Sequence, residues 1–466
     1  MNQFNGKRVH FIGIGGIGMS GLAQMCRELG AVVSGSDRGV NAPENRAIFH
    51  SLRQNGITIY PQDGSFVKHG GVDYIIYSTA IEADNPDFSA APETARLHRS
   101  QALFMAIQST PCRYSAAICG SCGKTTVTAM LGEALYRLNS DPVIINGGAL
   151  KFFANADHIG NYQAGTGDFL VFEADESDKS LINYQVDYAI LLNIGTDHYS
   201  KEELAELFAK FLTQVKIGAV MSRQVFELLK NQIPSALQVA IFEDEIPSSA
   251  GEWYVSQYCS GGNTASFTLN DQYNLQSHQL GAINALNMCA VTALLALMGF
   301  NPAKAAAATA EFSGVKRRGE FIGRTHRGSM IFDDYAHNPE KITSAINTAR
   351  ERIKGNIYAI FQPHGYAPMR FMKEELYRII NPFLHSGDRF FLLEPYYAGG
   401  TSSFSPGAKE VMELWRQMGA DKRYQIGESR DKVLDQVKNL AGADDLILVM
   451  GARDNSLPEF AFDFTR

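Results

Sequence analysis

Residues 118–126 read Ile-Cys-Gly-Ser-Cys-Gly-Lys-Thr-Thr and constrain the fold more than any other part of the chain. The apolar stretch at 114–118 predicts a buried strand, and residues 127–138 predict a helix. A glycine loop between a strand and a helix points its backbone N–H groups at an anion, typically a phosphate. Lys124 adds a positive charge, and Thr125 offers a hydroxyl to Mg²⁺. The full phosphate-loop pattern has another glycine where this chain has Ile118, so the loop is a shortened form.

The size and composition of the chain fit a globular protein of several domains. Its 466 residues predict about three domains. A net charge of −7 without a long basic run argues against nucleic-acid binding. No signal peptide and no apolar stretch of about 18 residues is found, so we expect a cytoplasmic protein without membrane insertion. Cys119 and Cys122 form a C-x-x-C pair, which leaves a redox or metal role open.

A second glycine loop, Gly-Ile-Gly-Gly-Ile-Gly at 13–18, lies near the start of the chain. A short apolar strand at 9–12 precedes it, and a helix to residue 29 and a strand at 31–34 follow. With Asp37 about 20 residues beyond, the pattern fits a nucleotide diphosphate on a helix N-terminus and a carboxylate near the ribose or base. Ser78 follows a later strand, 72–77, at the edge where such sheets bind ligands. Taken alone, these features suit NAD, FAD or another nucleotide equally.

Acidic residues and a histidine follow two predicted strands of the middle region. The strand at 169–172 runs into Glu173 and the acidic stretch 175–178, and the strand at 188–192 runs into Asp197 and His198. Beside a phosphate loop, such groups predict Mg²⁺ ligation and phosphoryl transfer. The alternative is that the acids cap helices and face solvent. A further helix at 281–297 carries Asn284 and Asn287 near its start, where Asn commonly caps.

The last region again alternates strands with helices. Strands are predicted at 330–332, 357–361, 390–393 and 446–449, and Pro339 suits the first turn of a helix to residue 352. The chain is therefore predicted to be an α/β protein of three domains. These are an N-terminal Rossmann-like domain (1–110), a central P-loop ATPase domain with a mainly parallel sheet (111–315) and a C-terminal Rossmann-like domain (316–466).

The motifs and their order resemble the Mur ligase family, the ATP-dependent amide-forming ligases of peptidoglycan precursor synthesis. The resemblance covers nearly the whole chain, and it is strongest to the members that add L-alanine to UDP-N-acetylmuramate. It rests on residues 10–20, Gly123-Lys124-Thr125-Thr126, Asn146-Gly147-Gly148, the stretch 173–178, Asp197-His198, Arg317-Arg318, the stretch 333–337, and Phe361-Gln362-Pro363-His364.

The resemblance implies a ligase that joins the carboxylate of UDP-N-acetylmuramate to the amine of an amino acid, with L-alanine expected, through an acyl phosphate. It implies ATP and Mg²⁺ as cofactors and a monomer or homodimer. The implied catalytic residues are Lys124, His198, Arg318 and His337, and Tyr335 would also lie near the amino acid. The implied ATP-binding residues are Gly120, Gly123, Lys124, Thr125, Thr126, Asn287, Arg318 and Asp334. The implied UDP-sugar-binding residues are Gly13, Gly15, Gly16, Ile17, Gly18, Met19, Asp37 and Ser78, and the implied metal ligands are Thr125, Glu173 and His198.

The chain departs from the family pattern where the amino acid would bind. The family run Phe-Gln-Pro-His-Arg-Tyr-x-Arg carries two arginines, and this chain has Gly365 and Pro368 in their places. Arginine suits a carboxylate because its planar fork donates two parallel hydrogen bonds. The amine substrate could therefore be Ala, Gly, Ser or a larger molecule. Other readings are a ligase that attaches a recycled peptide, a non-catalytic nucleotide-binding relative, and a nicotinamide-dependent oxidoreductase.

Overall fold

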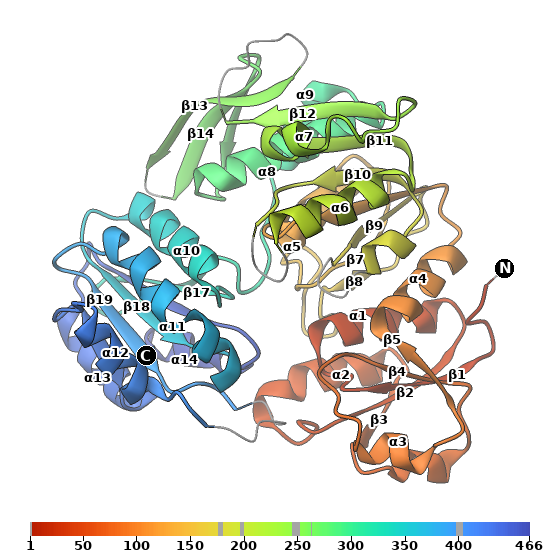
Figure 1. Ribbon diagram of the computed structural model, residues 1–466, viewed down its shortest axis with the longest axis horizontal. Helices are drawn as coiled ribbons and strands as arrows, with labels where there is room; N and C mark the ends of the chain where they lie inside the picture. The colour runs from red at the N-terminus through yellow and green to blue at the C-terminus, as the bar shows by residue number, and fades with distance from the viewer. Residues whose placement is uncertain (1, 176–179, 196–199, 245–251, 262, 398–403) are drawn as a thin grey trace. The chain divides into compact units, whose positions relative to one another are not determined.

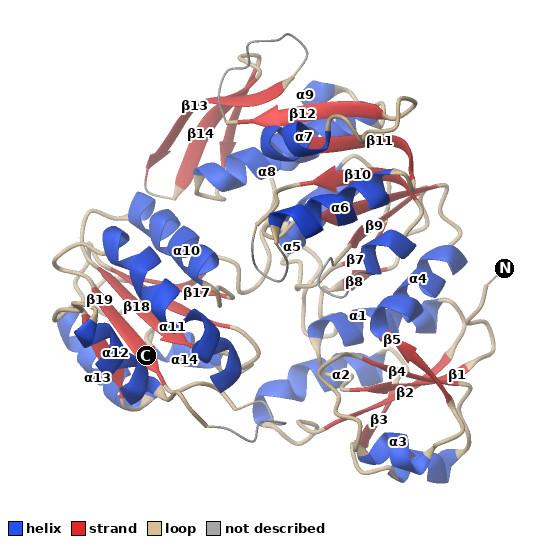
Figure 2. Cartoon of the chain, viewed as in Figure 1, coloured by secondary structure: helices blue, strands red, loops and turns tan. Residues whose placement is uncertain are grey.

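The structure is a computed structural model that describes residues 2–175, 180–195, 200–244, 252–261, 263–397 and 404–466. The chain divides into two compact units. The first contains Met1–Cys259 and Ala265–Val315, and the second contains Ser260–Thr264 and Lys316–Arg466. Helices and strands alternate along most of the chain (Figures 1 and 2). The predicted α/β class with mainly parallel sheets is confirmed.

The first sheet has five parallel strands in the order β3-β2-β1-β4-β5. Apolar runs such as Val9, Phe11 and Ile12 form its centre because parallel strands are covered on both faces. Strand order reverses beside β1, so the loop after β1 lies at the edge where ligands bind such sheets. The elements are β1 (Arg8–Ile12), α1 (Ile17–Glu28), β2 (Val32–Asp37), α2 (Arg46–Gln54), β3 (Thr58–Pro61), β4 (Tyr74–Tyr77), α3 (Pro86–Ala90), β5 (Ala95–His98) and α4 (Arg99–Ser109), with short 3₁₀ turns at Pro43–Asn45 and Ser65–His69.

The second sheet has ten strands in the order β15-β14-β13-β12-β11-β10-β6-β9-β7-β8. Its centre, from β7 to β12, is parallel, and β6 lies between β10 and β9. The elements are β6 (Tyr114–Cys119), α5 (Lys124–Arg137), β7 (Val143–Ile145), β8 (Tyr162–Gln163), β9 (Phe169–Glu173), a 3₁₀ turn (Ser180–Asn183), β10 (Val186–Leu191), α6 (Lys201–Leu212), β11 (Val215–Ser222), α7 (Arg223–Leu229), β12 (Gln238–Glu243), β13 (Trp253–Gly261), β14 (Thr264–Leu269), β15 (Tyr273–Ser277), α8 (Ala282–Leu297) and α9 (Pro302–Ala310).

The third sheet forms the second unit, with strand order β16-β17-β21-β18-β19-β20. Only its edge pair β16–β17 is antiparallel. Two apolar clusters cover its faces, one around Trp415 and Phe361 and the other around Ile360 and Phe464. The elements are β16 (Glu320–Arg324), β17 (Met330–Asp334), α10 (Pro339–Arg352), β18 (Ile357–Gln362), α11 (Tyr366–Ile380), a 3₁₀ turn (Asn381–Phe383), β19 (Arg389–Leu393), α12 (Ala408–Gln417), β20 (Tyr424–Gly427), α13 (Arg430–Leu440), β21 (Leu446–Gly451) and α14 (Leu457–Asp463).

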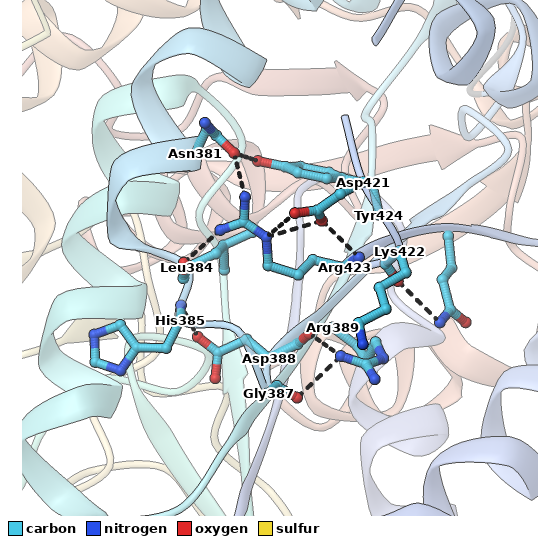
Figure 3. A network of polar contacts seen from close by, with 11 residues as sticks. Asn381, Leu384, His385, Gly387, Asp388, Arg389, Asp421, Lys422, Arg423 and Tyr424 are labelled. Carbon is cyan, nitrogen blue, oxygen red and sulfur yellow. Dashed lines mark hydrogen bonds and ion pairs between the residues drawn. The ribbon is translucent and has the colours of Figure 1, made fainter. Parts of the chain in front are cut away.

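A buried carboxylate organises the start of β19 in the second unit. Asp388 is fully buried, accepts hydrogen bonds from the backbone N–H groups of Ile357 (2.8 Å) and His385 (2.6 Å), and pairs with Arg350. A buried carboxylate is tolerable only with this number of donors. The neighbouring Arg423 guanidinium donates to the Leu384 carbonyl, and Figure 3 shows both groups at the same end of the sheet.

Several elements differ from the sequence prediction. Helix α5 begins at Lys124, and β9 and β17 extend through Glu173 and Asp334, so these functional candidates belong to the regular elements. Strands β12–β15 were not predicted. More and less exposed positions alternate along β13 and β15, whereas β12 has an apolar run at 239–242 that was not recognised as a strand. Within the described residues, no helix combines the length and apolar character needed to cross a bilayer.

Candidate active site

The phosphate loop joins β6 to α5 and has the strained backbone that its glycines predict. Gly120 and Gly123 have positive φ angles of 139° and 90°. A Cβ atom at Gly120 would lie 2.9 Å from Leu192 Cβ and 3.1 Å from the Asn193 backbone nitrogen, so a side chain has no room there. The position that lacks the usual glycine, Ile118, is a fully buried strand residue of β6. Ile118 therefore belongs to the strand, and the turn before the helix consists of residues 120–123.

The loop after β10 holds the phosphate loop in shape. The Asn193 side chain accepts a hydrogen bond from the Cys122 N–H (2.8 Å) and donates one to the Cys122 carbonyl (3.0 Å). The Ser121 hydroxyl accepts from the Gly195 N–H. Lys124 Nζ donates to the Gly120 carbonyl (2.7 Å), which folds its side chain over the loop. These contacts pre-form a cradle whose cation lies beside the turn, as phosphate binding requires.

The carboxylate of Glu173 lies beside this cradle, at the end of β9 next to β6. Its Oε2 accepts a hydrogen bond from the Gly147 N–H (3.0 Å), and a Cβ atom at Gly147 would lie 2.4 Å from that oxygen. Thr125 opens α5 and is 6% exposed, and the amide oxygen of Asn287 is 3.6 Å from the Cβ position of Gly123. Thr126, in the first turn of α5, is half-buried. Glu173, Thr125 and Asn287 therefore lie close to the phosphate loop, and their roles toward ATP and Mg²⁺ stay predictions.

The metal-ligand prediction can be followed only in part. Across the described residues, no group of three or more His, Cys, Asp or Glu side chains could hold an ion by itself. Glu176, Asp178, Asp197 and His198 lie outside the described residues. One carboxylate and one hydroxyl fit Mg²⁺, which commonly takes one or two protein ligands and completes its shell with phosphate oxygens and water.

The first glycine loop is tied to the end of β2. The N–H groups of Gly13 and Ile14 donate to the Ser36 carbonyl, and the Gly15 N–H donates to Asp37 Oδ2 (2.9 Å). Asp37 also accepts from the Gly39 N–H, so its carboxylate shapes the loop. A Cβ atom at Gly15 would lie 2.9 Å from Asp37 Oδ2. Of the remaining candidates, Gly16 caps α1 and donates to the Gly13 carbonyl, Ile17 and Gly18 form its first turn, Met19 is buried in the core, and Ser78 lies just after β4.

The second unit brings a separate set of candidates together around the end of β17. Asp334 accepts hydrogen bonds from the Gly319 and Ala336 N–H groups, and the Arg318 guanidinium carbon lies 5.0 Å from the Tyr335 ring centre. Burial raises the pKa of Asp334, and nearby Arg318 opposes that shift. The adjacent Arg317 instead pairs with buried Asp333 (3.0 Å), whose pKa burial raises to about 6. Both guanidinium groups lie near the Tyr335 ring, and Arg317 has in addition a buried carboxylate partner inside the unit.

His337 is held as a neutral imidazole. Its Nδ1 lies 2.8 Å from the Tyr335 carbonyl and must donate to it, which leaves a lone pair on Nε2. Burial, with Lys341 and His364 nearby, lowers the pKa of His337 to about 3. The ring also meets His364 edge-on, with 5.0 Å between centroids. Such a nitrogen can accept a hydrogen bond from an amine at neutral pH, while the low pKa of His337 makes it too weak a base to hold the proton.

This depressed pKa makes the second unit sensitive to acid. The unfolded chain binds a proton at His337 near pH 6.5 and the folded chain near pH 3, so stability from this group is present above pH 6.5 and is lost as pH falls towards 3. We expect unfolding monitored through Trp415 to show a loss of about 2 kcal/mol from this group by pH 5. His337→Gln should flatten that part of the profile, whereas His326→Gln, an exposed site of the same unit, should leave it unchanged. An unaltered profile in His337→Gln would show that the imidazole titrates alike in both states.

The sequence analysis overlooked two groups near the phosphate loop. Arg99 begins α4 after a strand that was not predicted, and its guanidinium lies 3.6 Å from Asp175. Asn193 follows the predicted strand at 188–192 and was not singled out, although its amide clamps the loop. The signal that could have found Arg99 is an arginine at the start of a helix that follows a short strand. Cys119 is buried and donates to the Ile190 carbonyl, and the six cysteines are free thiols.

Comparisons with known proteins agree with this geometry. Three families match in chain order: the Mur ligase family catalytic domain at residues 8–109, the Mur ligase middle domain at 118–295 and the Mur ligase glutamate ligase domain at 317–453. Together with full-length relatives at 30% identity, these matches show that the chain belongs to the Mur ligase family. It is an enzyme of the ATP-dependent, amide-forming ligase class of peptidoglycan precursor synthesis.

The similar proteins fall under two names, an alanine ligase and a murein peptide ligase. The chain is 30% identical to a UDP-N-acetylmuramate–L-alanine ligase of Agrobacterium fabrum, over 95% of this chain and 93% of that protein. It is 29% identical to the protein of the same name from Clostridium beijerinckii, over 96% and 95%. The fold matches a UDP-N-acetylmuramate-alanine ligase of Thermotoga maritima with a TM-score of 0.76 at 24% identity, over 98% of both chains. It also matches a murein peptide ligase of Psychrobacter arcticus, with a TM-score of 0.69 at 22% identity, over 98% and 97%.

Proposed function

We propose that this protein joins the carboxylate of UDP-N-acetylmuramate to the amine of an amino acid, with L-alanine as the first candidate, and that it works in the cytoplasm as a monomer or homodimer. The observation that carries the proposal is one cavity of roughly 70 Å³ in the first unit. Gly18 of the first glycine loop and Glu173 beside the phosphate loop both line it. A nucleotide-sugar on one cradle and ATP on the other would bring their reacting ends to this cavity.

The chemistry of the proposal follows from these groups. A carboxylate is a poor acyl donor, so the γ-phosphoryl group of ATP is transferred to it, and the amine then displaces phosphate. Lys124 would hold the phosphates by charge, and the N–H groups of the turn would orient them. Mg²⁺ held by Thr125 and Glu173, with His198 as the further candidate, would neutralise charge that develops on the phosphates. Arg318 and Asp334 would act on ATP from the second unit.

The amine would approach the neutral ring of His337. Its Nε2 lone pair can accept a hydrogen bond from the amine and so orient it for attack. Gly365 has a φ angle of 151°, which an arginine rarely adopts, so the backbone itself excludes the family residue at this position. Arg370 lies in the helix that follows Gly365, and it donates a hydrogen bond to the Ser405 carbonyl (2.6 Å). The partner of the amino-acid carboxylate would therefore differ from the family arginines.

The test is ADP release by the purified protein with Mg²⁺-ATP, UDP-N-acetylmuramate and a panel of L-amino acids and short peptides. We expect release that needs both the sugar nucleotide and one amine, with the amide product seen by mass. Release with a peptide alone would replace the amino acid by a recycled peptide as the substrate. ATP binding without release for any amine would contradict the ligase and favour a nucleotide-binding protein.

A further inference from the structure

Arg99 is fixed at the start of α4 by a capping arrangement. The His98 ring accepts a hydrogen bond from the Ser100 N–H, and the His98 N–H donates to the Gln101 side chain (2.9 Å). These reciprocal contacts satisfy donors at the helix start and set the direction in which the chain enters α4. The Arg99 side chain therefore leaves from a rigid base.

The guanidinium lies between the two glycine loops. A Cβ atom at Gly18, in the first turn of α1, would lie 2.5 Å from Arg99 Nη1, so the arginine occupies the space that this glycine leaves. On the other side, Arg99 Nη2 is 3.6 Å from Asp175 Oδ2, and Asp175 Oδ1 is 3.9 Å from Lys124 Nζ. The Asp175 carboxylate thus lies between the Arg99 guanidinium, beside the first glycine loop, and the Lys124 ammonium group of the phosphate loop.

The same groups border the cavity that Gly18 and Glu173 line. Gly18, Arg99, Gly147, Glu173, Asp175 and Tyr184 are among its lining residues. The Arg99 side chain is 35% exposed and that of Asp175 is 38% exposed, so a ligand can reach both. The two ion-pair distances exceed hydrogen-bond length, which makes the Asp175 contacts weak enough for a better-placed anion to replace them.

We propose that Arg99 binds the carboxylate of the acyl-donor substrate and holds it towards the phosphate loop. This inference rests on the proposed function. Asp175 marks the place, because its carboxylate already lies between Arg99 and Lys124. The planar guanidinium fork offers two parallel N–H donors to a carboxylate. In the first chemical step, one carboxylate oxygen forms a bond to the γ-phosphorus as the bond to the bridging oxygen breaks, and ADP leaves with that oxygen. Arg99 would fix the attacking carboxylate in line for this step.

Binding measurements with two sugar nucleotides test this role. UDP-N-acetylglucosamine carries the same diphosphate and a closely related sugar without the carboxylate, and UDP-N-acetylmuramate carries all three groups. Arg99→Ala should weaken UDP-N-acetylmuramate binding about tenfold to hundredfold, as expected for a lost charge-assisted pair. It should change UDP-N-acetylglucosamine binding less than about twofold. Arg99→Lys should recover only part of the loss because it keeps the charge and lacks the fork.

Control variants separate this role from folding. Arg27→Ala removes an exposed arginine at the far end of α1 and should leave both affinities unchanged. Binding of an ATP analogue and the thermal transition should be unaltered in Arg99→Ala. Equal losses for both sugar nucleotides would assign Arg99 to the diphosphate, and no loss for either would leave it as a partner of Asp175; both results overturn the inference. If the unsubstituted protein does not bind UDP-N-acetylmuramate, the proposed function falls together with it.

Discussion

Replacing Lys124 by alanine should reduce the kcat of ADP release by about 10²–10³-fold, the usual cost of removing one preorganised group at a transition state that gathers negative charge. The side chain is 12% exposed and folded over the phosphate loop through the Gly120 carbonyl. Its ammonium group is thus in place before ATP arrives. Because the charge on the transferred phosphoryl group is greatest in the transition state, kcat should fall more than ATP affinity. Single-turnover assays with saturating ATP and both other substrates measure this loss of rate in the chemical step.

A matched control separates the loss of catalysis from loss of structure. Lys216 lies in the same sheet region, is 61% exposed and is 4.0 Å from Asp187, so Lys216→Ala removes an equal charge away from the cradle. We expect it to retain full activity, and both variants should melt as the parent protein does. Activity above a tenth of the parent level in Lys124→Ala would contradict the role of the phosphate loop in catalysis.

Much of this site could be predicted because its chemistry depends on local sequence. Gly120 and Gly123 fall where the backbone has positive φ, and Glu173 ends a strand that pairs with β6, so glycine spacing and the strand end were sufficient to indicate these residues as candidates. The parallel order of the central strands brings their carboxyl ends to one edge, and short apolar runs are sufficient to predict those strands.

The parts that escaped prediction depend on contacts between distant segments. Arg99 meets Gly18 and Asp175, which are 81 and 76 residues away, and no local pattern encodes such a meeting. Asn193 is recognisable as a clamp only once β10 is known to lie beside β6. Strands β13 and β15 alternate more and less exposed positions on an outer part of the sheet, so they lack the apolar runs that reveal the inner strands.

Asp388→Ala should cost the second unit about 3–5 kcal/mol, the expected penalty for breaking a buried pair and leaving its partners without an acceptor. Its carboxylate is fully buried and accepts from two backbone N–H groups and from Arg350, at the end of the sheet shown in Figure 3. Asp388→Asn should cost less because one acceptor oxygen remains.

Tryptophan fluorescence isolates this effect, because the chain has two tryptophans, one in each unit. In a Trp253→Phe background, Trp415 alone reports denaturant unfolding of the second unit, where it is fully buried and packs near Phe390. The control Glu374→Ala removes an exposed ion pair with Arg378 on α11 and should leave the midpoint almost unchanged. A small shift for Asp388→Ala would mean that water reaches the freed donors. A large one would show that this buried carboxylate, which no sequence motif marks, stabilises the amino ends of β18 and β19.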